Sequence, residues 1–133
     1  MDLSRATQIS ATGLRAQSAR MRVIAENLAN SDSVAATSGG QPYRRKTILF
    51  SPETADGNAG VRVRGISRDS SQFERSYQPG HPAADAAGYV LLPNVNSLVE
   101  AADMKAAQRS YEANLNAIEA ARSMTLRTID LLK

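Results

Sequence analysis

The sequence predicts a mainly α-helical protein in which two long terminal helices flank a small β-rich or irregular insert. Residues 97–132 contain no Pro and no Gly and repeat apolar residues with a helical period, and residues 3–28 carry a second helical repeat. The segment between them combines turn residues with short extended patterns. We therefore expect residues 1–30 and 97–133 to form one discontinuous helical domain, with a linker and insert at residues 31–96.

The C-terminal helix carries a heptad repeat, in which steps of three and four residues keep one stripe on the same side. Ser97 and Glu100 have the spacing of a capping box at its start. At a rise of ~1.5 Å per residue this helix would be roughly 50 Å long, so it needs a packing partner. The stripe consists of Ala101, Met104, Gln108, Tyr111, Leu115, Ile118, Arg122, Thr125, Ile129 and Leu132.

The N-terminal helix offers that partner, because it carries a stripe with the same alternating steps. Asp2 lies where a carboxylate would cap the helix start, and Asn30 lies where a residue tolerant of the left-handed conformation could end it. The termini should therefore pack as a helical pair. This second stripe consists of Leu3, Thr7, Ser10, Leu14, Gln17, Met21, Ile24 and Leu28.

Polar residues interrupt both stripes, and Ala fills much of the remaining surface. A pair of that quality would be weak on its own, since helices gain most of their stability from burying an apolar face. Two interpretations remain open. Either the helices form a long antiparallel hairpin that closes on itself, or other subunits complete the stripes.

The middle segment contains four stretches that favour β-strands. They combine β-branched or aromatic residues with alternating polarity, and Pro or turn residues bound them. The turn Asp56-Gly57-Asn58 separates the first two. The four stretches are residues 43–50, 61–64, 73–77 and 89–92.

Candidate chemistry in the sequence is sparse. His81 has Asp85 four residues later but no second His and no Cys, so a hydrogen-bonded loop histidine is favoured over a metal ligand. Glu74 and Asp85 could be proposed as a carboxylate pair for glycan cleavage, although nothing marks either as buried. Gly39-Gly40 lacks the Lys and Ser or Thr of a phosphate-binding loop. We predict no catalytic residue, metal site or cofactor, and the absence of Cys excludes thiolate chemistry.

The charge pattern argues against nucleic-acid binding. The net charge is +3, and the densest basic cluster is Arg44, Arg45 and Lys46, which we interpret as a solvated strand edge. No apolar stretch is long enough for membrane insertion. The N-terminal residues lack the apolar region of a cleaved secretory signal, so we expect any export to use another route.

Two sets of motifs resemble a known family. Asn27-Leu28-Ala29-Asn30-Ser31 followed by Tyr43-Arg44-Arg45-Lys46 resembles the N-terminal signature of flagellar rod, hook and hook-associated proteins. The block from Tyr77 to Asn96, which contains Gly88-Tyr89 and Pro93-Asn94-Val95, resembles the short proximal rod proteins of the bacterial flagellar basal body more specifically. Another short rod protein at a neighbouring level remains the main alternative.

The resemblance implies a non-enzymatic subunit that transmits torque through the rod. In this family the terminal helices form a coiled-coil inner layer of a hollow helical tube with copies of the chain and with other rod proteins. The neighbours would be the membrane ring and export gate on one side and the distal rod on the other. Such subunits pass unfolded through the flagellar type III export apparatus, without a cleaved signal peptide.

A periplasmic glycan hydrolase and a DNA-binding regulator are the competing function classes, and a zymogram or a gel-retardation assay would reveal them.

The resemblance also assigns residues to subunit packing. The expected packing residues are Leu14, Met21, Ile24, Asn27, Leu28, Asn30, Met104, Tyr111, Leu115, Ile118, Ile129 and Leu132.

Overall fold

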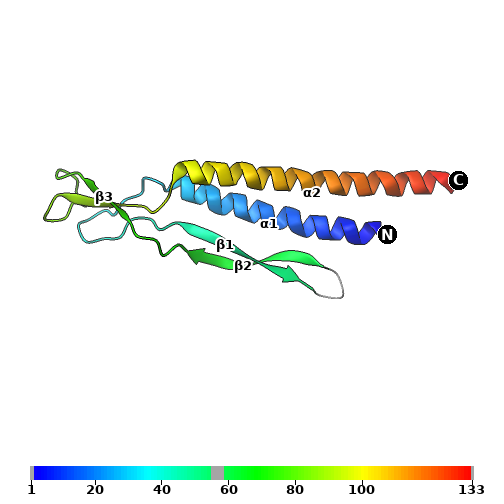
Figure 1. The fold of residues 1–133 in the computed structure, drawn as a ribbon, viewed down its shortest axis with the longest axis horizontal. Helices are drawn as coiled ribbons and strands as arrows, with labels where there is room; N and C mark the ends of the chain where they lie inside the picture. The colour runs from blue at the N-terminus through cyan, green and yellow to red at the C-terminus, as the bar shows by residue number, and fades with distance from the viewer. Residues whose placement is uncertain (1, 55–58, 133) are drawn as a thin grey trace. The chain divides into compact units, whose positions relative to one another are not determined.

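The computed structural model, which describes residues 2–54 and 59–132, confirms the two long helices and the small strands between them (Figure 1). The predicted turn at residues 56–58 lies outside the described residues. The elements in chain order are α1 (Leu3–Ala29), β1 (Lys46–Glu53), β2 (Gly60–Arg68), β3 (Glu74–Tyr77), β4 (Tyr89–Leu92) and α2 (Ser97–Leu131).

The strands form two separate two-stranded sheets, β1 with β2 and β3 with β4. All four predicted strands are present, and β4 has the predicted bounds. β1 begins three residues later than predicted because residues before it bond elsewhere: the Tyr43 amide donates to the Ser33 carbonyl and the Arg45 amide donates to Asn94 Oδ1. Those two amides are therefore unavailable for strand pairing.

The chain groups into two compact units, and each contains part of both helices. The first unit comprises the described residues within 1–22, 48–65 and 105–133, and the second comprises residues 23–47 and 66–104. In the first unit the start of α1 lies beside the end of α2, so the helices are antiparallel (Figure 1). Over the described residues, neither helix is both long and apolar enough to span a membrane.

Small residues bring the two helices close together in the first unit. Ala16 on α1 and Ala107 and Ala121 on α2 are buried. A Cβ atom added to Gly13 would lie only 2.7 Å from Asn114 Oδ1, so this glycine sits against the facing helix. This close approach explains a glycine in the middle of a helix, where it otherwise costs about 1 kcal/mol relative to Ala.

Between Met104 and Arg122, the side of α2 that is buried within the chain differs from the predicted stripe at every second position, and the later stripe positions Thr125, Ile129 and Leu132 are exposed. Met104, Tyr111 and Ile118 are half-buried as expected, but Leu115 remains 39% exposed. At the intervening positions, the covered residues lie one position earlier than predicted: Ala107, Asn114 and Ala121 are covered, and Gln108, Leu115 and Arg122 are exposed. The small side chains allow the helices to approach more closely, so they form the interface in place of the predicted residues.

The other flank of α1 contacts the first sheet. The Val61 amide donates to Thr12 Oγ1 at 3.1 Å, and a Cβ atom added to Gly60 would lie 2.9 Å from the same oxygen. In the first unit α1 therefore contacts both α2 and β2. The predicted α1 stripe is at least half-buried throughout, with Ile24 fully buried and Leu14, Met21 and Leu28 half-buried.

The helix caps confirm one expectation and correct another. Asp2 Oδ1 accepts hydrogen bonds from the amides of Ser4 and Arg5, as predicted for an N-cap. For α2 the capping box at Ser97 was wrong, because Asn96 is the N-cap and its Oδ1 accepts from the amides of Leu98 and Val99. Glu100 is fully buried and bonds elsewhere.

The second sheet forms a compact hairpin in the second unit. Glu74 pairs with Leu92 and Tyr77 with Tyr89, and Val90 is buried. The rings of Tyr77 and Tyr89 meet edge to face with centroids 5.3 Å apart. Gly88 has φ +85°, a conformation that favours glycine, and an added Cβ would lie 2.9 Å from the Tyr77 ring.

Candidate functional site

Asn27 is the centre of a buried polar network in the second unit. Its side chain is 1% exposed and makes four hydrogen bonds. Nδ2 donates to the Lys46 carbonyl at 2.8 Å and to Glu100 Oε2 at 3.0 Å, and Oδ1 accepts from Tyr43 Oη and the Lys46 amide, each at 2.9 Å. A side-chain amide offers two donors and two acceptor positions, so all of them are filled within the chain.

Arg45 balances the buried carboxylate of Glu100. Its Nε donates to Glu100 Oε1, and its terminal nitrogens reach Asp69 at 3.3 Å and Asp103 at 3.7 Å. Burial alone would lower the pKa of Arg45, but the hydrogen bonds and charges of Glu100 and Asp69 together outweigh it and raise that pKa. The guanidinium therefore stays charged, and Glu100 is not an uncompensated buried charge.

Two neighbours of this network also have shifted pKa values. Burial, followed by the charges of Glu26 and Glu100, raises the pKa of the Tyr43 hydroxyl, so it remains a donor to Asn27. The Ser71 amide is the main cause that lowers the pKa of Asp69, and Arg45 adds to the effect.

Arg44, Arg45 and Lys46 do not form the solvated strand edge that we predicted. All three are half-buried. Arg44 lies 4.2 Å from the centroid of the Phe73 ring and donates to the carbonyls of Asp69 and Ser71, while Lys46 pairs with Glu26. Acidic side chains and backbone carbonyls from other segments of the second unit therefore hold these three side chains. The sequence pattern did not reveal these distant partners.

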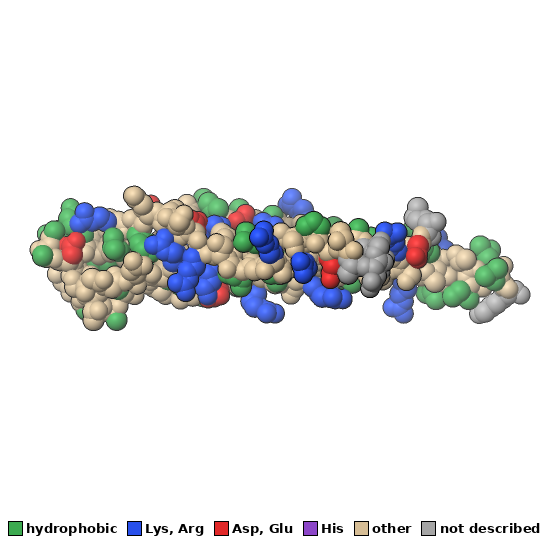
Figure 2. All heavy atoms as spheres, turned by 90° about the horizontal axis from the view of Figure 1, so that it is seen from below, with side chains coloured by type: hydrophobic (Ala, Val, Ile, Leu, Met, Phe, Trp, Pro, Cys, Tyr) green, Lys and Arg blue, Asp and Glu red, His purple; other side chains and the backbone are tan. Residues whose placement is uncertain are grey.

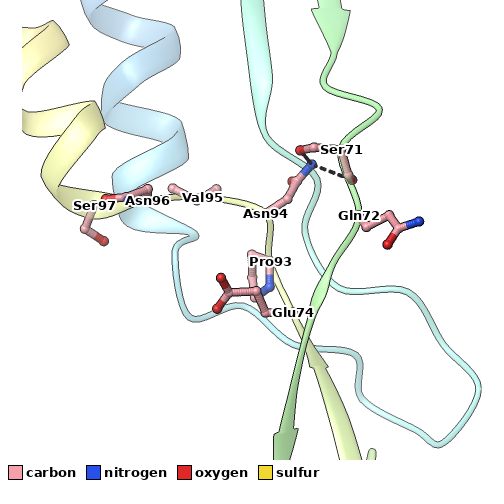
Figure 3. A pocket seen from close by; sticks show the side chains of 8 residues that line it. All are labelled: Ser71, Gln72, Glu74, Pro93, Asn94, Val95, Asn96 and Ser97. Atoms are coloured by element: carbon pink, nitrogen blue, oxygen red, sulfur yellow. Dashed lines mark hydrogen bonds between the residues drawn. The ribbon is translucent and has the colours of Figure 1, made fainter.

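Asn94 ties the Pro93-Asn94-Val95 block to this network. Its Oδ1 accepts from the Arg45 amide at 2.7 Å, and its Nδ2 donates to Ser71 Oγ at 3.0 Å (Figure 3). An open groove of about 460 Å³ lies beside it. The groove is lined by Ser71, Gln72, Glu74, Pro93, Asn94, Val95, Asn96 and Ser97.

Two of the candidates for catalysis or metal binding, His81 and Asp85, have structural partners in the hairpin loop, whereas Glu74 is an exposed residue of β3. His81 is the predicted hydrogen-bonded loop histidine, because its Nδ1 accepts from the Ala83 amide at 3.0 Å. Asp85 Oδ1 accepts from the amides of Tyr89 and Ala87, and the Tyr89 bond is the main cause that lowers its pKa. The described residues contain no group of three or more His, Cys, Asp and Glu side chains placed to hold a metal ion.

The second notable feature is apolar and lies at the end of α2 in the first unit. We call five side chains there the apolar arc: Met124, Leu126, Ile129, Leu131 and Leu132. They are 48% to 87% exposed. At 3.6 residues per turn these positions span about 220° of the helix circumference, far wider than the stripe of a surface helix. Figure 2 shows hydrophobic side chains gathered at this end of the helix.

Only some of the predicted packing residues belong to these two features. Asn27 belongs to the polar network, and Asn30 closes α1 by donating from Nδ2 to the Glu26 carbonyl. Ile129 and Leu132 belong to the exposed apolar arc. The sequence analysis missed the role of Glu100 in the network, because its spacing from Ser97 favoured a helix cap. The signal that could have indicated burial was its position directly before Ala101, the first residue of the apolar stripe.

Comparison with known proteins gives consistent matches. Residues 86–131 match the family described as flagellar basal body rod FlgEFG protein C-terminal. The flagellar basal-body rod protein FlgC of Agrobacterium fabrum is 47% identical, over 98% of this chain and 96% of that protein. The FlgC proteins of Salmonella typhimurium (42% identity, 92% of each chain) and Bacillus subtilis (40% identity, 94% of this chain and 95% of that one) are similar over nearly the same length.

Proposed function

This chain belongs to the family of flagellar basal-body rod proteins FlgC, and from that premise we propose how it builds the rod. It is a structural subunit of the proximal rod and not an enzyme. Its two helices lie side by side with helices of neighbouring subunits, which are copies of itself and other rod proteins. Together they form the inner layer of a hollow tube that transmits torque from the membrane ring to the distal rod.

The apolar arc carries this proposal. Five large apolar side chains at 48% to 87% exposure are costly in water, at about 25 cal/mol for each Å² of apolar surface. Apolar side chains spread over about 220° of a helix exceed the stripe of about 100° that a single packing face covers. The arc therefore supports contact with more than one neighbour, as in an open helical array.

The polar network supports the mechanical role. Its charged groups are paired and its central amide is fully bonded, so breaking any one bond leaves a buried polar group without a partner. Such a network holds the end of α1 and the start of α2 in one arrangement within the second unit. A subunit that transmits torque needs this rigidity.

We further propose that the chain reaches the rod unfolded, through the flagellar type III export apparatus and without a cleaved signal peptide. Membership of the rod family supports this route. In the rod, the subunit would lie between the membrane ring with its export gate and the distal rod.

The test places one carboxylate on the apolar arc. Leu126→Asp should leave the isolated chain folded, because this side chain is already 53% exposed, but should block incorporation into basal bodies and abolish swimming in a strain that lacks its own copy. Ser123→Asp is the matched control, since it adds the same charge at an exposed position outside the arc. Normal incorporation of Leu126→Asp would contradict burial of the arc.

A further inference from the structure

A second candidate contact surface lies on α1 in the first unit. Arg15, Ser18, Ala19 and Arg22 are spaced i, i+3, i+4 and i+7, which is the pattern that forms a hole for a side chain of a packed helix. We call these four residues the α1 hole. They line a hollow of about 450 Å³, together with Leu14 and Tyr111.

The α1 hole has a small floor and charged ends. Ser18 and Ala19 leave room at its middle, and Arg15 and Arg22 stand seven residues apart at its two ends. Within residues 2–54 and 59–132, neither guanidinium has an acidic partner. The hole therefore presents two positive charges about 10 Å apart along the helix.

α2 presents the complementary arrangement, which we call the α2 knob. Leu115 is 39% exposed, and Glu112 and Glu119 lie three residues before and four residues after it, on the same side of the helix. Both carboxylates are exposed, and neither forms an ion pair with any residue that the structure describes. They are also seven residues apart, so their spacing along the helix equals that of Arg15 and Arg22.

We propose that the α1 hole of one subunit receives the α2 knob of a second copy of this chain. Leu115 fills the space above Ser18 and Ala19, while Glu112 and Glu119 pair with the two arginines. Charge complementarity at equal spacing selects this partner, because a helix without two acidic residues at that spacing would leave the arginines unpaired. The inference rests on the proposed function and names one of its subunit contacts.

Cysteine cross-linking tests the contact directly, because the chain contains no Cys of its own. One tagged full-length chain carries Ser18→Cys and another carries Leu115→Cys, so a disulfide can form only between copies. We expect the mixed pair to cross-link at least about tenfold faster than either variant with itself, given the required geometry. Ala113→Cys, an exposed α2 position two residues from Leu115, is the control for chance collisions.

Charge reversal provides the second arm. Arg15→Glu with Arg22→Glu should reduce the mixed cross-link about tenfold, and Glu112→Arg with Glu119→Arg on the partner chain should restore it. Equal cross-linking to Leu115→Cys and Ala113→Cys, or no effect of reversal, would overturn the proposed contact. Cross-linking of Ser18→Cys in cells to another rod protein alone would also overturn it, by showing a different occupant.

Incorporation into basal bodies separates this proposal from the proposed function. If the charge-reversed chain enters the rod and supports swimming, the hole and knob are not used, but the chain remains a rod subunit. If the unmodified chain fails to enter the rod, the proposed function itself fails.

Discussion

At the scale of single residues, the family motifs were recognisable in the sequence, but their partners were not. Asn27 was expected among the subunit-packing residues, and in the structure Tyr43, Lys46 and Glu100 of the same chain bond its side-chain amide. These residues are 16 to 73 positions away in sequence. Local spacing carries no information about such distant partners, so only the fold could supply them.

The network makes the two motif asparagines unequal. Asn27→Ala should lower the free energy of unfolding by about 3 kcal/mol, because it leaves buried donors and acceptors on three residues without partners. Asn30→Gly should cost at most about 1 kcal/mol, since glycine also suits the end of a helix. Urea unfolding followed by circular dichroism measures both, and swimming should decline in the same order. Equal losses of stability would contradict the central place of Asn27.

At the scale of helices and strands, the sequence predicted more. Both helices lie within one residue of the expected ends, and the hairpin strand at residues 89–92 has the expected bounds, because apolar periodicity and Pro mark such limits. The sequence predicted less accurately which residues of α2 contact α1. The heptad pattern favoured Leu115, whereas the closest approach uses Gly13 against Asn114, which apolarity cannot reveal.

A double-mutant cycle tests this close approach. Gly13→Ala improves helix propensity by about 1 kcal/mol, but its Cβ would collide with the Asn114 side chain, whose Nδ2 donates to the Ser110 carbonyl. We expect Gly13→Ala to give no net stabilisation in the natural chain and to stabilise the Asn114→Ala chain by about 1 kcal/mol. Urea midpoints of the four variants give the coupling, and additive effects would show that the helices are farther apart.

At the scale of the whole molecule, the sequence left open whether the helices close on themselves or need other subunits. The answer depends on which apolar residues the chain covers by itself. It covers Ile24 and Val90 but leaves Leu126, Ile129 and Leu132 exposed. Periodicity places a residue on a side of a helix without saying whether the same chain or another one covers that side.

The most direct test of assembly through the apolar arc is a side-chain-resolved map of purified basal bodies that contain this chain. The exposed fractions of Leu126, Ile129 and Leu132, which are 53%, 48% and 82% in the single chain, should fall to nearly zero in the rod through contacts with at least two neighbouring subunits. A rod in which these three side chains still face water, or touch only their own chain, would contradict the proposal.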